Sequence, residues 1–130
     1  TAIKNAQLPL VYSDVPKKGW MNRTITLLEE LGIGDKLKST PNQLSGGQQQ
    51  RVAIARALIN EPAVIFADEP TGNLDSKTSL EIIEIFKRLN NQGKTIVMIT
   101  HEIDIANQAK RIVTIHDGKI VSDIKLKKTK

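Results

Sequence analysis

The chain has 130 residues, of which 39% are hydrophobic, 25% are charged and only 3% are aromatic. This balance is typical of one globular domain with an aliphatic core, as in a parallel α/β sheet. The absence of cysteine excludes a disulfide framework and a cysteine-ligated zinc site. No apolar run approaches the roughly 18 residues of a membrane-spanning helix.

The net charge of +5 is concentrated at the two ends of the chain. Residues 1–60 carry 8 basic and 4 acidic side chains, residues 61–124 carry 7 and 10, and residues 125–130 add four lysines. A basic balance can indicate nucleic acid, but the segment with the candidate chemistry is net acidic, so no nucleic-acid partner is expected. The terminal lysines are typical of a solvated tail, with binding to a partner as the alternative.

The first half of the chain is expected to be helical with connecting loops. Residues 1–16, which contain two prolines, are expected to be irregular. Apolar residues spaced three and four apart predict a helix over 17–31. The same spacing predicts a second helix that begins after Ser45 and ends before Pro62.

The second half alternates between strand and helix. Continuous apolar runs at 63–67 and 95–99 predict two buried strands, and helical spacing predicts a helix between them from about 76 to 91. The side chains expected to face the core from that helix are Leu80, Ile83, Phe86 and Leu89. This strand–helix–strand order indicates a parallel α/β core.

The C-terminal part is expected to form a hairpin. A short helix is expected near 103–109, and the apolar segments 111–115 and 119–122 flank Asp117 and Gly118, a strong turn signal. The chain is therefore expected to have three parts: a helical subdomain at 1–60, the later part of an α/β core at 61–124, and a basic tail at 125–130.

The turn before the second helix has the composition of a phosphate-binding loop. Ser45 is followed by Gly46, Gly47 and Gln48 where the helix begins. Adjacent glycines leave backbone N–H groups accessible, and a helix N-terminus adds partial positive charge, so a phosphate can bind there. The alternative is that Ser45 only caps a helix that packs in the core.

Two carboxylates, Asp68 and Glu69, follow the first predicted strand. Ligands of open α/β sheets bind at this edge, and buried carboxylates are costly unless they contact a cation or a substrate. Adjacent strand residues point to opposite sides, so one carboxylate is expected near Mg²⁺ and the other near a reacting water. The alternative is a solvated loop.

Asp75, His101 and His116 are weaker candidates for a site. Asp75 is placed to cap the helix that starts beside it, which is its simplest explanation. His101 ends the second strand and would share the sheet edge with Asp68 if the strands are parallel neighbours, with a structural role as the alternative. His116 lies beside the hairpin turn and is expected at the surface.

The order of these motifs resembles the ATPase subunits of ABC transporters. The segments that carry the resemblance are Leu44–Leu58 with Ser-Gly-Gly-Gln, Ala67–Asp75 with Asp-Glu-Pro-Thr-Gly-Asn-Leu-Asp, and Thr100-His101. Residues 42–50 and 70–76 are most similar to the macrolide-export and lipoprotein-release (MacB/LolD-like) branch. The resemblance implies an α/β fold of the P-loop NTPase type, present here as a helical subdomain, a partial parallel sheet and a C-terminal hairpin.

The resemblance also implies a role for each matching position. Residues 45–48 match the signature motif, which contacts the γ-phosphate of ATP held by the other subunit of a dimer. Asp68 matches the Walker B aspartate that supports Mg²⁺, and Glu69 matches the catalytic glutamate that positions the attacking water. Asp75 matches the D-loop at the dimer interface, and His101 matches the switch histidine at the γ-phosphate.

Cofactors and partners follow from the same resemblance. It implies ATP and Mg²⁺ as cofactors, a second ATPase subunit and a transmembrane permease subunit as partners, and a cytoplasmic location at the inner face of the cell membrane. Phosphoryl transfer to water requires neutralised charge, an oriented nucleophile and exclusion of bulk water. Two subunits that close over ATP would supply all three, and their closure would drive transport.

The 130 residues contain no P-loop. Gly93, Lys94 and Thr95 form the nearest match, but position 88 is Arg88 rather than glycine and the tripeptide leads from a helix into a strand. The P-loop and glutamine loop of such proteins would lie upstream of Thr1, so the chain alone is expected to be inactive. Its two strands are expected to leave an apolar face and an edge open, which favours self-association.

Two other functions remain open from the sequence. An SMC-like chromosome-maintenance ATPase also splits its ATP site, although residues 1–40 show no coiled-coil heptads. Salt-dependent DNA binding would favour that function. A non-catalytic dimerisation module would fit the missing P-loop, and a P-loop found upstream would exclude it.

Overall fold

The computed structural model describes residues 1–126, and its contacts divide the chain into two compact units, Thr1–Met98 and Ile99–Lys130. The elements in chain order up to the second strand are α1 (Ala2–Gln7), η1 (Leu8–Tyr12), α2 (Trp20–Glu30), η2 (Gly34–Lys36), η3 (Pro41–Gln43), α3 (Gly46–Leu58), β1 (Val64–Asp68), α4 (Ser76–Asn91) and β2 (Thr95–Ile99). The second unit contains α5 (Ile103–Ala106), β3 (Arg111–His116) and β4 (Lys119–Lys125). The α/β class is confirmed, whereas the division at residue 60 stays a prediction.

The start of the chain is helical, so the expectation that residues 1–16 are irregular is wrong. The Thr1 side chain caps α1, and the small side chains Ala2 and Ala6 are buried where α1 packs on α2 and α3. Pro9 lies in the first turn of η1, where its missing N–H costs no hydrogen bond. Six residues are too few to show a helical period, and a helix this short depends on packing for its stability.

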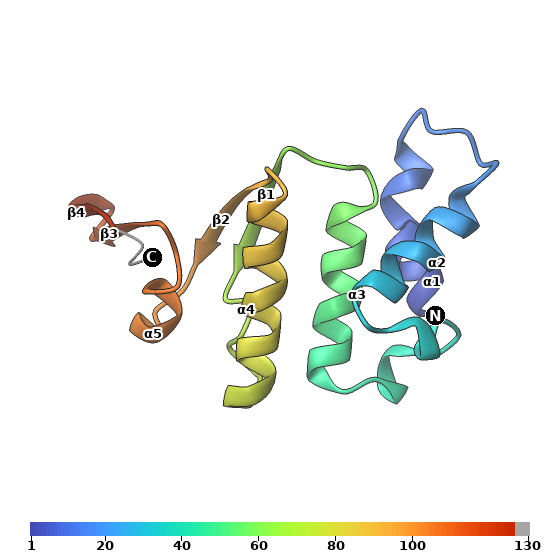
Figure 1. The fold of residues 1–130 in the computed structure, drawn as a ribbon, viewed down its shortest axis with the longest axis horizontal. Coiled ribbons are helices and arrows are strands. Elements are labelled where there is room, and N and C mark those ends of the chain that lie inside the picture. Colours follow the sequence, from blue (N-terminus) through green and yellow to red (C-terminus); the bar gives the residue numbers. More distant parts are fainter. Residues whose placement is uncertain (127–130) are drawn as a thin grey trace. The chain divides into compact units, whose positions relative to one another are not determined.

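Helix α3 lies between α4 on one side and α1 and α2 on the other (Figure 1). Its buried residues are Gly47, Val52, Ile54, Ala55 and Leu58. Burial of the aliphatic members of this set contributes about 25 cal/mol for each Å² of apolar surface removed from water. Helix α3, which begins at the turn formed by residues 45–48 (the signature turn), is therefore packed against other helices on more than one side.

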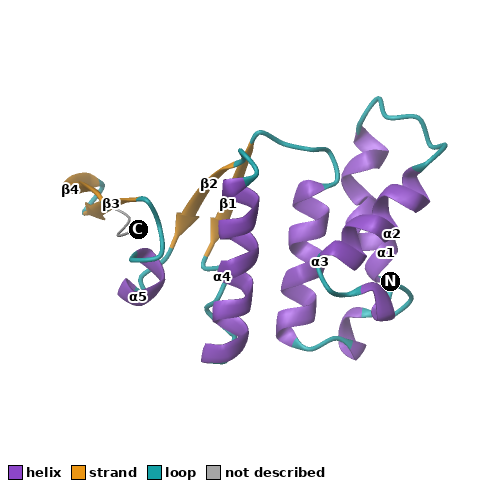
Figure 2. Ribbon diagram, viewed as in Figure 1, coloured by secondary structure: helices purple, strands orange, loops and turns teal. Residues whose placement is uncertain are grey.

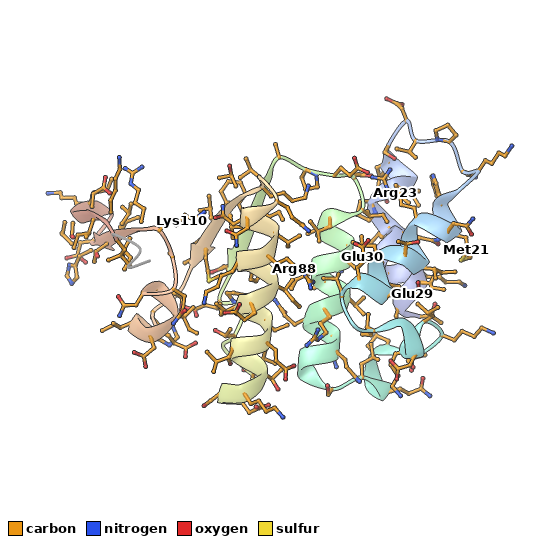
Figure 3. The ribbon with its side chains drawn as sticks, in the orientation of Figure 1. Met21, Arg23, Glu29, Glu30, Arg88 and Lys110 are labelled. Carbon is orange, nitrogen blue, oxygen red and sulfur yellow. The ribbon has the colours of Figure 1, made fainter. Side chains whose placement is uncertain are left out.

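Two arginines connect α3 and α4 to the end of α2. Arg51 on α3 donates from Nη1 to the backbone oxygen of Leu31 (2.8 Å), and its Nη2 lies 2.8 Å from Glu81 Oε2 on α4. Arg88 on α4 donates from Nη2 to the backbone oxygen of Glu30 (3.2 Å) (Figure 3). The last carbonyl groups of a helix have no partner within it, so these two bonds satisfy the end of α2.

Helix α4 has the predicted bounds, but one of its predicted core residues is exposed. Ile83, Phe86 and Leu89 are buried as expected. Leu80 is 55% exposed, and at this turn Ser79 faces the core instead. The neighbouring Thr78 lies against Gly47 at the start of α3, a close approach of the two helices that the apolar spacing does not reveal.

Strands β1 and β2 form a parallel two-stranded sheet beside α4 (Figure 2). Ile65 and Ala67 of β1 are buried in the same cluster as the apolar side chains of α4. The opposite face leaves large apolar side chains exposed: Val64 at 42%, Phe66 at 75%, Val97 at 39% and Ile99 at 57%. The predicted open apolar face is therefore confirmed, and self-association through it stays a prediction.

The predicted hairpin is confirmed as β3 and β4, which pair antiparallel with an irregularity between Thr114 and Ile115. Asp117 and Gly118 have φ values of 48° and 73°, the left-handed conformation that two-residue hairpin turns require. Strand β4 continues through Lys125, which was predicted to begin the basic tail. The remaining tail lysines lie outside the described residues.

No helix within residues 1–126 is both long enough and apolar enough to span a bilayer.

Candidate functional site

The signature turn forms a complete helix cap at the start of α3. Ser45 lies before the helix in extended conformation, and its Oγ accepts from the backbone N of Gln48 (3.4 Å). The Gln48 side chain returns the interaction, because its Oε1 accepts from the backbone N of Ser45 (2.9 Å). The capping explanation for Ser45 is therefore realised, while Ser45 and Gly46 also remain exposed to solvent.

The two glycines of this turn face the loop that follows β1. A Cβ atom on Gly46 would lie 3.1 Å from Leu74 Cδ2, which is a tight contact. A Cβ atom on Gly47 would overlap Thr78 Cγ2 at the start of α4. Glycine is therefore required at 47 by close packing within this chain, in addition to any ligand.

The carboxylates Asp68 and Glu69 differ in environment, as their adjacent positions predict. Asp68 is exposed at the end of β1, whereas Glu69 is half-buried. Glu69 has a φ of 43°, in the left-handed region, and its carbonyl oxygen accepts from the backbone N of Gly72 (3.2 Å) to close a turn. A non-glycine residue held in this conformation costs on the order of 1 kcal/mol, and such residues cluster at functional sites.

One cavity of about 380 Å³ is lined both by the signature turn and by the loop after β1 that contains Glu69. Gly46 lines it from the start of α3, and Glu69, Gly72 and Leu74 line it from the loop after β1. Arg56 lines it from further along α3 and donates from Nη1 to Asn5 Oδ1 (3.0 Å). Two motifs more than twenty positions apart in the sequence thus meet at one cavity, which also contains a cationic side chain.

Asp75 caps helix α4, as its position predicts. Its Oδ1 accepts from the backbone N of Thr78 (3.0 Å), and its Oδ2 accepts from Thr78 Oγ1 (2.6 Å). Both bonds favour the ionised carboxylate, with the Thr78 hydroxyl as the larger cause, and they lower the pKa of Asp75. The predicted contact of Asp75 with a partner subunit or nucleotide stays a prediction.

Thr78 and Leu74 pack against the two signature glycines. Leu74 belongs to a motif that the sequence indicates, although this contact was not expected, whereas Thr78 was missed. A signal for Thr78 exists, because a threonine three residues after an aspartate at a helix start is placed to bind that cap. Nothing in the sequence indicates that its methyl group faces the turn at 46–47.

The two histidines both lie in the second unit. His101 is exposed and follows β2, and its predicted place beside the carboxylates stays a prediction. His116 is exposed, as expected, with Nδ1 3.1 Å from Oδ2 of the adjacent Asp117. The tripeptide at 93–95 follows the end of α4 and leads into β2, the reverse of the strand–loop–helix order of a P-loop.

The donor set fits a magnesium–phosphate site better than a protein-only metal site. Within residues 1–126 no three His, Asp or Glu side chains gather closely enough to hold a metal ion. Mg²⁺ at phosphoryl-transfer sites uses one or two carboxylates and completes its shell with water and phosphate oxygens. The exposed Asp68 suits that arrangement.

Comparison with known proteins defines the class. Residues 5–72 match the sequence profile of the ABC transporter family, so the chain belongs to this family. It is similar to part of the ATP-binding domain, as the motifs predict, which favours the transporter interpretation over a chromosome-maintenance ATPase.

Two individual ABC transporter proteins are similar in sequence to most of this chain. An uncharacterized ABC transporter ATP-binding protein of Thermotoga maritima is 55% identical over 92% of this chain and 51% of its own length. The macrolide export ATP-binding/permease protein MacB of Chlorobium phaeobacteroides is 54% identical over 95% of this chain and 19% of its own length.

A solved structure of an ATP-binding cassette is also similar to this chain. The dimeric ATP-binding cassette MJ0796, bound to ADP and Pi in a post-hydrolysis state, superposes with a TM-score of 0.83 and 42% identity. The match covers 99% of this chain and 58% of that one. The chain thus spans about half the length of the Thermotoga relative and somewhat more of this structure.

Proposed function

We propose that the protein binds and hydrolyses ATP as the ATPase subunit of an ABC transporter, and that ATP-driven closure of two such subunits powers transport. The observation that carries this proposal is the shared cavity, where the exposed signature turn at Gly46 meets the loop that contains Glu69. When two subunits close over ATP, the turn of one subunit and the carboxylate of the other would act on the same nucleotide, the turn on its phosphates and the carboxylate on the attacking water.

The signature turn would act on ATP held by a second subunit. Ser45 and Gly46 are exposed at the N-terminus of a 13-residue helix, where the backbone N–H groups and the helix dipole favour a phosphate. Gly47 leaves room for Thr78 beside the turn, and Gln48 closes the cap that fixes the turn. The turn is therefore formed before any nucleotide arrives.

The carboxylate pair would divide the remaining work. Asp68, exposed at the end of β1, would hold Mg²⁺ through water, and the bound metal would supply neutralisation of phosphate charge. Glu69, half-buried on its turn, would orient a water and accept its proton. His101 would contact the γ-phosphate, and Asp75 would lie at the interface between subunits.

The proposed partners are a second ATPase subunit and a transmembrane permease subunit, with the protein at the inner face of the cell membrane. Two relatives support this: MJ0796 was solved as a dimer, and MacB is named as an ATP-binding/permease protein. We further propose that the 130 residues alone do not hydrolyse ATP at a useful rate, because they contain no P-loop to hold it.

The substitution Glu69→Gln in the chain at its full natural length tests the role of the carboxylate. Glutamine keeps the size of the side chain but cannot accept a proton, so the ATPase rate is expected to fall by about 100-fold or more. Nucleotide-dependent dimerisation, measured by light scattering, should persist. Glu84→Gln, which changes an exposed carboxylate on α4, is the matched control. Equal rates in wild type and Glu69→Gln would show that Glu69 does not orient the water.

A second assay addresses the 130 residues by themselves. Purified chain 1–130 is expected to release no phosphate from ATP above the uncatalysed background. Turnover comparable to that of the full-length protein would contradict the proposal that the P-loop must be supplied.

A further inference from the structure

The signature turn and the start of α4 touch at one point that the proposed reaction does not use. Gly47 is buried, and the space where its side chain would project is filled by Thr78 Cγ2. Next to this contact, Leu74 Cδ2 occupies the space beside Gly46. The back of the signature turn is therefore closed by two side chains from residues 74–78.

Thr78 is fixed in the orientation that makes this contact. Its hydroxyl donates to Asp75 Oδ2 (2.6 Å), and its backbone N donates to Asp75 Oδ1 (3.0 Å). A β-branched side chain on a helix has few χ1 rotamers. Because the hydroxyl is held by Asp75, the methyl group has to point toward Gly47, and rotating it away would break the 2.6 Å bond.

We propose that Thr78 is a positioning residue: oriented by Asp75, it supports the Gly46–Gly47 turn from behind and couples that turn to the Asn73–Asp75 loop of the same chain. The backbone of residues 46–48 keeps its place for a phosphate because its other side is packed. Only the catalytic consequence of this inference rests on the proposed function, since the contact itself is a property of the fold.

A size exchange between positions 47 and 78 tests the contact in the chain at its full natural length, without nucleotide. Gly47→Ala adds a methyl group where Thr78 Cγ2 lies, and overpacking of this kind is expected to lower the melting temperature by about 5 °C. Thr78→Ser removes that methyl group and keeps the hydroxyl on Asp75. The double variant is therefore expected to melt within about 2 °C of Thr78→Ser alone.

The control is Thr26→Ser, the same chemical change at an exposed position of α2. Combined with Gly47→Ala, it should leave the full loss of about 5 °C in place. Equal losses from Gly47→Ala in the wild-type and Thr78→Ser backgrounds would overturn the proposal. So would a melting temperature that Gly47→Ala leaves unchanged.

Hydrogen exchange provides a measurement that does not need Gly47→Ala to fold. Thr78→Ser leaves a gap behind the turn, so the backbone amides of residues 46–48 are expected to exchange faster, while those of Thr26→Ser match wild type. Unchanged exchange in Thr78→Ser would contradict the supporting role.

The consequence for function is a weaker response to ATP. In Thr78→Ser the ATP concentration for half-maximal dimerisation is expected to rise by about tenfold, because the turn is no longer held in place. A wild-type protein that binds no ATP would refute the proposed function and leave the nucleotide-free melting and exchange results to judge Thr78 independently. A normal ATP response in Thr78→Ser would refute the coupling even if the contact exists.

Discussion

Helix α3 and the β1–β2 sheet carry the two halves of the proposed site, and they differ in how completely they are covered. Helix α3 packs against α1, α2 and α4, and its apolar residues Val52, Ile54 and Leu58 are at most 5% exposed. The sheet is packed on one face by α4, while its other face leaves Phe66 75% exposed. The signature turn therefore begins a helix that is packed against its neighbours, whereas the carboxylates follow a strand whose sheet has one face exposed.

This difference in packing predicts whether the signature turn or the carboxylate pair changes its geometry when other parts of the protein cover the sheet. The turn at 45–48 is fixed by its own cap, by the packing of α3 and by Thr78. Glu69 has a left-handed conformation in a turn closed by the backbone N of Gly72, at the end of a strand with an open face. We expect the signature turn to be preformed, and the geometry of Asp68 and Glu69 to respond to whatever covers the sheet.

The largest expected contrast compares one side chain from each region. Ile54→Ala on α3 is expected to lower the free energy of unfolding by about 2 to 4 kcal/mol, because it leaves a cavity in a closed core. Phe66→Ala on β1 is expected to cost about 0.5 kcal/mol or less, since the ring is mostly exposed. Urea denaturation of both variants measures the contrast. A cost for Phe66→Ala near that of Ile54→Ala would show that the face is covered in the folded protein.

The next contrast concerns the arginine that connects α3 to its neighbours. Arg51→Ala is expected to cost about 2 kcal/mol, because the backbone oxygen of Leu31 and the carboxylate of Glu81 both lose a charged donor. Lys87→Ala removes a more exposed ion pair on α4 and should change stability by about 0.5 kcal/mol or less. Denaturation of the two variants side by side tests this, and similar costs would mean that Arg51 acts only as a surface charge.

The elements that the sequence predicts correctly are those whose signal is local. The bounds of α4 follow from its apolar period together with the cap at Asp75, and the hairpin follows from Asp117 and Gly118. The expectation for Leu80 is wrong because Ser79, and not Leu80, is the buried residue at that turn, and the apolar period alone does not decide which of two adjacent residues is buried. Helix α1 was missed because six residues are too few to show a helical period.

For the candidate site as well, local features can be predicted from the sequence and tertiary contacts cannot. The residue types and spacing of the signature turn and the carboxylates can be found in the sequence, and so can the expectation that Asp68 and Glu69 differ in environment. The left-handed backbone of Glu69 and the contact between Thr78 and Gly47 cannot, because each depends on how a loop packs against a distant segment. Sequence reasoning thus identifies the chemical groups, and packing determines how they are held.

A smaller effect separates the two explanations for Ser45. Ser45→Ala removes the side-chain acceptor of a 3.4 Å cap and is expected to cost about 0.5 to 1 kcal/mol. Ser45→Asn keeps a capping oxygen, so the stability of the protein is expected to return to within a few tenths of a kcal/mol of wild type. If Ser45 also binds phosphate, ATP-dependent dimerisation stays impaired in Ser45→Asn. Recovery of both properties would leave Ser45 as a cap alone.

The smallest effect is the pKa of Asp75, which reports the bond that orients Thr78. The hydroxyl of Thr78 is the main cause that lowers the pKa of Asp75, followed by its backbone N–H. Thr78→Val removes the hydroxyl and keeps the backbone donor, so a carboxyl NMR titration should show the Asp75 pKa rising toward its ordinary value. Because a lowered pKa in the folded state stabilises above the unfolded pKa, the wild-type advantage is present near neutral pH and disappears as the pH falls through the Asp75 pKa. Asp123, whose pKa is lowered by Arg111 on the hairpin, is the internal reference and should not move. A shift of both carboxyls would point to a general change in the fold, and an unmoved Asp75 would show that the hydroxyl of Thr78 is not held there in solution.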